Sequence, residues 1–272
     1  MARATWRVGA ASLAFLAASC LAAVWGPPAA TAATRQTIFV YGDSLSWQAG
    51  SYFEHDFSTA TTINEAHVFP GTAVCTWLPD IKSLTRADAP TVVVLEFVGN
   101  VSNCDGSVTS PTALANAYKA DLKTAIDALL TVAVHTIVVD EGPRTDCTAY
   151  AYCAAQSKLH DAFKQVVSSF DSKNIVYAGL ADRAVETPSG RFTRLLPCLA
   201  AEVRARLCAK NALITVRSAD GVHFCPVPNT SHGVMMPCPV YASGAYRFAT
   251  GFANSVWMLD PATKPRSGTT TP

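Results

Sequence analysis

A serine, an aspartate and a histidine in this 272-residue sequence have the types and spacing that nucleophilic catalysis requires. Ser44 lies in the stretch FVYGDSLSW, and Asp220 precedes His223 by three residues in SADGVHFC. A serine hydroxyl becomes an effective nucleophile when a histidine accepts its proton and an acid orients that histidine. The spacing lets the Asp220 carboxylate reach Nδ1 of His223 and leaves Nε2 free to meet Ser44.

Neighbouring polar and aromatic residues have simpler interpretations. We interpret Asp43 as a structural residue whose carboxylate organises the turn before Ser44 by local hydrogen bonds. His55 and His160 are interpreted as surface residues, and Trp47 as either core or pocket wall, with core preferred.

Apolar runs that alternate with helical patterns indicate how the reactive residues are positioned. Strands are predicted at residues 37–42, 61–66, 91–99, 135–142 and 173–179. Helices are predicted at 113–132, 154–170, near 199–210 and within 241–259. This alternation indicates βαβ units, and therefore an α/β fold whose central parallel sheet is covered by helices on both faces.

Polar residues follow several of these strands, and the carboxyl ends of parallel strands share one edge of a sheet. Ser44 follows the first predicted strand and Asn100 the third. The Asn100 amide could donate a hydrogen bond to an oxyanion or simply cap the strand. Asp140, Glu141 and Arg144 follow the fourth strand, where they either help to bind substrate or are solvated loop charges.

Four ordered blocks, YGDSLS, PGTAVCTW, LEFVGN and DGVHF, resemble those of the SGNH (GDSL-type) hydrolases across nearly all of the chain after residue 36. The resemblance implies a flavodoxin-like three-layer α/β/α sandwich and ester hydrolysis without a metal or other cofactor. It implies that Ser44 is the nucleophile, Asp220 the triad acid and His223 the base. The implied oxyanion donors are the backbone N–H groups of Ser44 and Gly71 and the side-chain amide of Asn100.

The third block departs from the common G-x-N-D pattern of that family. Val98 replaces the first glycine and Val101 the aspartate, which makes Asn103 a minor competitor of Asn100. Gly71 stands in a Pro-Gly dipeptide, so a tight turn is the alternative to its donor role. Ser46 replaces the second glycine of a G-x-S-x-G elbow, which argues against the standard α/β-hydrolase fold.

Composition and the amino terminus indicate export rather than nucleic-acid binding. Half of the residues are hydrophobic, 15% are charged and the formal charge is +1, so nothing favours nucleic acid or an acidic membrane as partner. Two early arginines, an apolar stretch and an Ala-Thr-Ala site predict a secretory signal peptide at residues 1–32. A retained membrane anchor is the alternative. A hydrolase domain is expected at 33–260 and a loose tail at 261–272.

Eight cysteines remain after the signal peptide, and in an exported chain an even number predicts a disulfide framework. Nearest-neighbour pairing gives Cys75–Cys104, Cys147–Cys153, Cys198–Cys208 and Cys225–Cys238. No C-x-x-C motif or Cys/His cluster at zinc spacing is present, so no metal site is expected.

The function expected is that of a secreted or cell-envelope serine esterase. Similarity of two blocks to exported actinobacterial SGNH proteins implies short acyl (acetyl) esters on envelope carbohydrate as substrates. The alternatives are a lipase-like esterase for longer chains, an acyltransferase to a sugar hydroxyl, and a non-catalytic carbohydrate-binding protein on an esterase scaffold. We expect a monomer that acts on a small-molecule or glycan ester, with no stable membrane insertion after signal cleavage.

Overall fold

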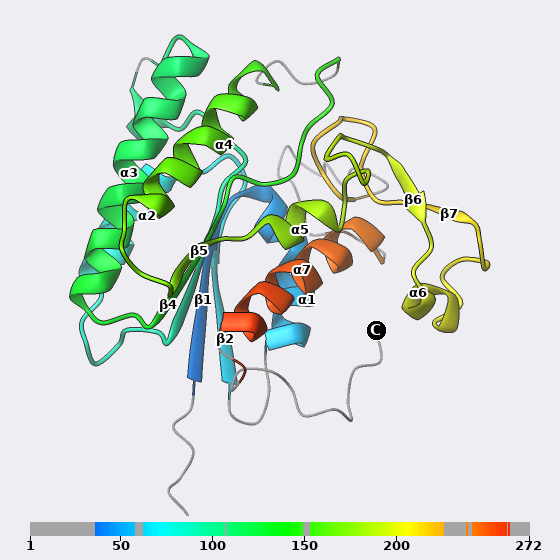
Figure 1. The fold of residues 1–272 in the computed structure, drawn as a ribbon, viewed down its shortest axis with the longest axis horizontal. Helices are drawn as coiled ribbons and strands as arrows, with labels where there is room; N and C mark the ends of the chain where they lie inside the picture. Colours follow the sequence, from blue (N-terminus) through cyan, green and yellow to red (C-terminus); the bar gives the residue numbers. More distant parts are fainter. Residues whose placement is uncertain are drawn as a thin grey trace, which may run out of the picture. The chain divides into compact units, whose positions relative to one another are not determined.

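A five-stranded parallel sheet forms the centre of the fold, in the order β2-β1-β3-β4-β5 (Figure 1). The strands are β1 (Gln36–Gly42), β2 (Thr62–Val68), β3 (Val92–Glu96), β4 (Thr136–Asp140) and β5 (Ile175–Tyr177). Every neighbouring pair is parallel. All five carboxyl ends therefore lie at one edge, and the predicted α/β class is confirmed.

Helices cover both faces of this sheet (Figure 1). On one face lie α2 (Val74–Ser83), α3 (Pro111–Thr131) and α4 (Cys153–Ser168). On the other lie α1 (Ser44–Phe57), α5 (Gly179–Arg183) and α7 (Ser243–Leu259). Because successive side chains of a strand point to opposite faces, β1 supplies Phe39 and Tyr41 to one core and Ile38 and Val40 to the other. The three-layer sandwich that the sequence predicts is present.

The structure is a computed structural model that describes residues 36–57, 62–106, 108–148, 153–225, 238, 241–259 and 261. The predicted signal peptide and all of the predicted tail except residue 261 lie outside these residues. The described residues fall within one compact unit. Among them, no helix has both the length and the apolar character needed to cross a bilayer.

A small excursion beyond β5 differs from the predicted pattern. It contains the antiparallel strands β6 (Leu195–Pro197) and β7 (Leu213–Thr215) and the short helix α6 (Ala200–Arg204). The helix predicted near 199–210 ends early because Arg206 adopts a left-handed turn conformation with φ of 60°. The Cys198–Cys208 disulfide closes this excursion.

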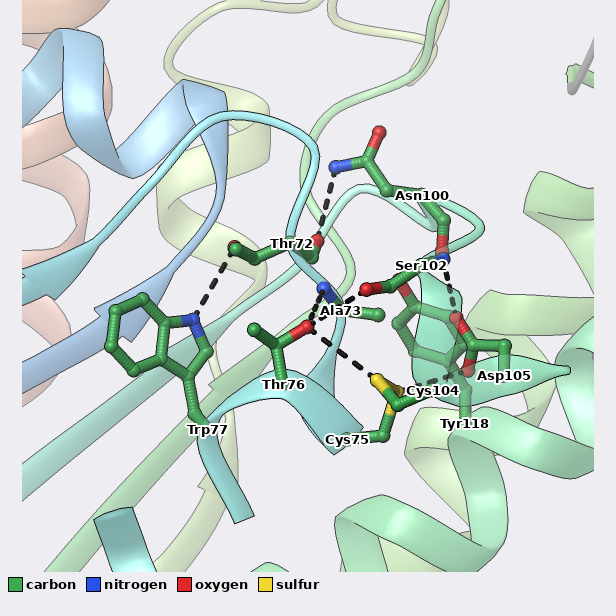
Figure 2. Close-up of a disulfide and its surroundings, with 10 residues drawn as sticks. All are labelled: Thr72, Ala73, Cys75, Thr76, Trp77, Asn100, Ser102, Cys104, Asp105 and Tyr118. Atoms are coloured by element: carbon green, nitrogen blue, oxygen red, sulfur yellow. Dashed lines mark hydrogen bonds between the residues drawn. A yellow bond between two sulfur atoms is a disulfide. The ribbon is translucent and has the colours of Figure 1, made fainter. Parts of the chain in front are cut away.

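Three of the four predicted disulfides are confirmed: Cys75–Cys104, Cys198–Cys208 and Cys225–Cys238. The first joins the start of α2 to the 3-10 turn Asn103–Asp105 (Figure 2). The fourth predicted pair depends on the side chain of Cys153, which lies outside the described residues.

Candidate active site

Ser44 is the first residue of α1, two residues beyond the end of β1. The sequence predicts the strand but not a helix that begins at this serine. Gly42 is needed at the junction because a Cβ there would lie 2.4 Å from Oγ of Ser46. The chain therefore passes directly from strand to helix and presents Ser44 at the carboxyl edge of the sheet.

Asp43 joins the end of β1 to the end of β3. Its Oδ1 accepts a hydrogen bond from the backbone N–H of Leu45 at 3.0 Å. Its Oδ2 accepts from the Val98 N–H at 2.7 Å and from the Asn100 amide at 3.0 Å. Burial raises the pKa of Asp43 to about 6, and the two backbone hydrogen bonds oppose that rise. Asp43 thus braces the turn, as the sequence predicts.

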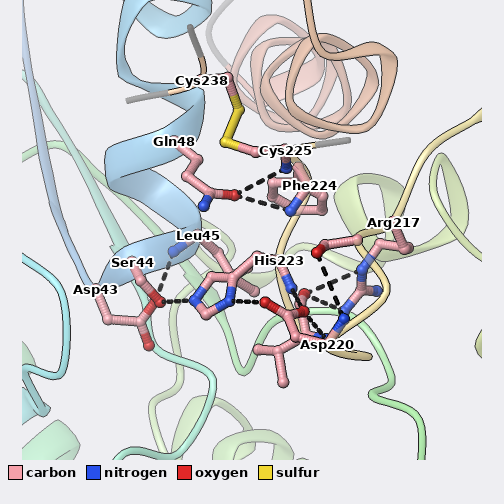
Figure 3. Close-up of polar contacts among 12 residues, drawn as sticks. Asp43, Ser44, Leu45, Gln48, Arg217, Asp220, His223, Phe224, Cys225 and Cys238 are labelled. Carbon is pink, nitrogen blue, oxygen red and sulfur yellow. Dashed lines mark hydrogen bonds and ion pairs between the residues drawn. A yellow bond between two sulfur atoms is a disulfide. The ribbon is translucent and has the colours of Figure 1, made fainter. Parts of the chain in front are cut away.

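Ser44, His223 and Asp220 form a hydrogen-bonded chain (Figure 3). Nε2 of His223 lies 3.0 Å from Oγ of Ser44, and Nδ1 lies 2.7 Å from Oδ2 of Asp220. The structure therefore brings Ser44 into contact with His223, which lies 179 positions later in the sequence.

The electrostatics of Asp220 favour a charged carboxylate. Burial alone would raise its pKa, but hydrogen bonds from the His223 side chain and from the backbone N–H groups of His223 and Val222 hold the pKa well below its usual range. A permanently ionised Asp220 can orient the imidazole and stabilise its protonated form.

Gln48 connects the histidine loop to the nucleophile helix, a role that the sequence does not reveal. Its Oε1 accepts hydrogen bonds from the Phe224 N–H at 2.8 Å and the Cys225 N–H at 3.3 Å (Figure 3). Gln48 lies one helical turn after Ser44, so α1 carries both the serine and a support for the segment after His223.

Arg217 is a second residue that sequence reasoning missed. Its buried guanidinium donates from Nε (3.1 Å) and Nη2 to the Val222 carbonyl, and from Nη1 to the Arg144 carbonyl at 2.9 Å. The rings of Phe192 and Phe224 lie 5.3 and 5.4 Å from its guanidinium carbon. Burial lowers the pKa of Arg217 to about 10, so it stays protonated at neutral pH. Arg217 thereby fixes the loop that carries Asp220 and His223.

Gly71 and Asn100 lie on the other side of the serine, after β2 and β3. Gly71 has φ of 76°, a conformation that favours glycine. The Asn100 amide donates to Asp43 and, at 3.2 Å, to the Thr72 carbonyl (Figure 2). Asn103 is exposed in the 3-10 turn and makes no such contact within the described residues. Among those residues, the backbone N–H groups of Ser44 and Gly71 donate no hydrogen bond.

Asp140 and Glu141 are buried, so the interpretation as solvated loop charges is wrong for both. Glu141 forms hydrogen bonds with the side chains of His160 and Tyr177. His160 is consequently half-buried rather than the surface residue that the sequence predicts. The sequence around Glu141 does not reveal that its partners, His160 and Tyr177, come from α4 and β5. For this reason the sequence alone suggests a solvated charge.

Trp47 is half-buried and does not belong to either core, which corrects the preferred interpretation. Its ring centroid lies 6.4 Å from that of Phe69, whose side chain is 56% exposed. The pair lies beside the nucleophile because Trp47 follows Ser44 on α1 and Phe69 precedes Gly71.

A buried group of carboxyls lies beneath the site. Oε2 of Glu96 accepts from the Ser46 hydroxyl at 2.6 Å and from its N–H at 3.1 Å. Burial, followed by repulsion from nearby acids, raises the pKa of Glu96, Asp140 and Asp182 well above the usual range. Asp140, Glu141 and Asp182 lie close enough together to hold a metal ion.

Comparison with known proteins supports the fold. No family model matches the sequence, and no curated protein is similar to it in sequence. The lipase/acylhydrolase from Enterococcus faecalis has 13% identity and a TM-score of 0.53, covering 86% of this chain and 100% of that chain. More distant is the catalytic domain of peptidoglycan O-acetyltransferase A from Streptococcus pneumoniae (14%, TM-score 0.47, 86% and 98%). An acetyl xylan esterase is similarly distant (11%, TM-score 0.49, 81% and 99%). The likeness to the Enterococcus faecalis protein shows that the chain has the fold of the SGNH (GDSL-type) hydrolases, whose sequence blocks it resembles.

Proposed function

We propose that this protein is a serine esterase that hydrolyses carboxylic esters through an acyl-serine intermediate. The observation that carries the proposal is the continuous hydrogen-bonded chain from Ser44 Oγ through His223 to Asp220, with distances of 3.0 and 2.7 Å. A nucleophile, a base and an acid that orients the base are the parts that acyl transfer requires.

The reaction begins when Oγ of Ser44 attacks the ester carbonyl and its proton passes to Nε2 of His223. Asp220 stabilises the resulting imidazolium. As the tetrahedral intermediate collapses, the bond to the alcohol oxygen breaks and His223 returns the proton to the leaving alcohol. Water then loses a proton to His223 and attacks the acyl-serine. As this second tetrahedral intermediate collapses, the bond from the acyl carbon to Ser44 Oγ breaks, His223 returns the proton to Oγ, and the carboxylic acid is released.

The developing oxyanion requires donors that are already in place. The backbone N–H groups of Ser44 and Gly71 fit this role because neither donates within the described part of the chain. Ser44 also lies at the amino end of α1, where the helix dipole favours negative charge. The Asn100 amide would join them by exchanging its 3.2 Å contact with the Thr72 carbonyl for the oxyanion.

Short acyl esters, such as acetyl groups on cell-envelope carbohydrate, are the proposed substrates, by resemblance to exported proteins with similar blocks. The three disulfides support maturation in an oxidising compartment outside the cytoplasm. Longer-chain esters, acyl transfer to a sugar hydroxyl and non-catalytic carbohydrate binding remain the alternatives to be tested.

The test compares Ser44→Ala with wild type on p-nitrophenyl acetate, butyrate and octanoate. Ser51→Ala is the matched control, because Ser51 is exposed on the same helix. We expect Ser44→Ala to lose at least about 1000-fold in kcat and Ser51→Ala to keep wild-type activity. Preference for the acetyl ester supports a short-chain substrate. Wild-type turnover by Ser44→Ala would refute the proposed function.

An acceptor experiment separates hydrolysis from transfer. Wild type is incubated with p-nitrophenyl acetate with and without a neutral oligosaccharide, and acetylated sugar and free acetate are both measured. A hydrolase releases acetate in equal amounts under both conditions, whereas a transferase forms mainly acetylated sugar.

A further inference from the structure

A cavity of about 450 Å³ lies beside the histidine loop, between the segment after β4 and the turn before β6. Its lining includes Arg144, Asp146, Gln156, Arg191 and Phe192. The volume lies in the range of small-molecule pockets. The catalytic chain of Ser44, His223 and Asp220 does not account for its charged lining.

The wall that carries Arg144 is rigidly built. The buried Gln156 accepts hydrogen bonds from the N–H and the hydroxyl of Thr145 at 2.9 and 3.1 Å, and its amide donates to the Pro143 carbonyl at 3.3 Å. The backbone N–H of Arg144 donates to Oε1 of Glu186 at 2.6 Å. The backbone of Arg144, a residue of the cavity lining, is therefore fixed by these bonds.

Arg191 is presented from the opposite wall by a tight turn. The Thr187 N–H donates to the Arg191 carbonyl at 2.9 Å, and the Gly190 N–H donates to the Thr187 carbonyl at 2.8 Å. The Arg191 N–H in turn donates to the Thr187 hydroxyl at 3.1 Å. These bonds hold the residue in place without using its guanidinium.

The lining carries two guanidinium groups. Within the described residues, neither the Arg144 nor the Arg191 guanidinium forms a close ion pair, and the charge of Arg144 acts to lower the pKa of the buried Asp182. The one acid in the lining, Asp146, accepts at Oδ1 from the N–H and the hydroxyl of Thr148. The lining itself contains two arginines and one acid, and the planar guanidinium group suits carboxylate and phosphate oxygens.

The cavity is joined to the loop between Asp220 and His223. The Asp146 N–H donates to the Gly221 carbonyl at 2.8 Å. Arg217 donates to the carbonyls of both Arg144 and Val222. A ligand in the cavity is therefore held by a wall that is hydrogen-bonded to the histidine loop.

We propose that this cavity is a subsite for an anionic group, a carboxylate or a phosphate, on the alcohol portion of the ester substrate, and that Arg144 and Arg191 bind it. This inference rests on the proposed esterase function and narrows its substrate class. The substrates favoured are acylated sugar acids or sugar phosphates rather than neutral glycans. The leaving alcohol would be held on the His223 side, where its oxygen receives the proton.

Equilibrium binding to the Ser44→Ala variant tests the subsite without relying on turnover. Glucuronate, glucose 6-phosphate and neutral glucose are titrated calorimetrically at low ionic strength. We expect one of the two anions to bind at least tenfold more tightly than glucose, and the stronger one identifies carboxylate or phosphate. Arg144→Gln and Arg191→Gln, added singly, should each weaken that binding about tenfold, the loss of roughly one charge-assisted hydrogen bond.

Arg86→Gln is the matched control because Arg86 is exposed and does not line the cavity. It should bind the anion as tightly as its parent. Equal binding of both anions and glucose, or unchanged binding after both arginine substitutions, would overturn the proposal.

A kinetic comparison in the active enzyme tests whether the subsite serves the substrate. The ratio of kcat/KM for 4-acetoxybenzoate to that for phenyl acetate should fall about tenfold in Arg144→Gln or Arg191→Gln. If the cavity binds the anion but the ratio of the two kcat/KM values is unchanged in both variants, the cavity does not serve as a subsite for the ester substrate. Failure of the proposed esterase function would instead appear as wild-type turnover by Ser44→Ala, with the binding result unaffected.

Discussion

Replacing Arg217 by lysine should loosen the histidine loop without removing the positive charge. Arginine makes three hydrogen bonds here, two to the Val222 carbonyl and one to the Arg144 carbonyl. One ammonium group cannot reproduce this forked geometry, so the Arg217→Lys variant would leave one buried carbonyl without its donor. An orphaned buried acceptor costs about 1–3 kcal/mol, and we expect the free energy of unfolding to fall by that amount.

The same substitution should reduce catalysis more than substrate binding. A displacement of His223 by about 1 Å can cost on the order of 100-fold in rate, so kcat on p-nitrophenyl acetate should fall about 10- to 100-fold with KM little changed. Activity is measured well below the melting temperature. Arg183→Lys is the control, since the side chain of the exposed Arg183 bonds, among the described residues, only its own helix at the Gly179 carbonyl. A wild-type kcat in a folded Arg217→Lys protein would refute the positioning role.

Two further predictions concern stability. The pKa values of Glu96, Asp140 and Asp182 are raised in the folded state. Above about pH 4 these carboxyls therefore keep protons in the folded state that they lose in the unfolded state. Because the folded state then binds more protons, the free energy of unfolding should fall as pH rises. Urea denaturation from about pH 5 to 8 should show this fall, and Asp182→Asn should reduce its slope; an equal slope in the variant would contradict it. Replacing Cys75 and Cys104 together by serine opens a loop with a sequence separation of 29 and should cost about 3.6 kcal/mol in urea denaturation. Unchanged stability in that double variant would show that the bridge does not constrain the unfolded chain.

The sheet could be predicted from sequence because all of its strands except β2 are short apolar runs. Parallel strands buried on both faces need such runs, as in Val92–Glu96. The helix that begins at Ser44 was not predictable in the same way, since its apolar residues do not stand out from the polar ones around them. The small excursion of β6 and β7 was also missed, because three-residue strands leave too little pattern.

The candidate triad could be predicted because a reactive serine and a D-x-x-H spacing both have local signatures, and the structure places these residues in contact. Gln48 and Arg217 could not, because their roles depend on carbonyl and amide groups that only the fold brings near. The burial of Glu141 and His160 could not be predicted for the same reason, because their hydrogen-bond partners come from different elements. Local chemistry is visible in sequence, whereas the contacts that support it arise from tertiary structure.

The most direct test of the central claim, that Ser44 is an activated nucleophile, is covalent labelling with a fluorophosphonate probe followed by peptide mass mapping. We expect one adduct, on Ser44, formed at neutral pH and lost in Ser44→Ala and in His223→Ala. The exposed Ser51 on the same helix should remain unlabelled. A folded wild-type protein that shows no labelling at Ser44, or labelling of Ser44 that is unchanged in His223→Ala, would contradict the account.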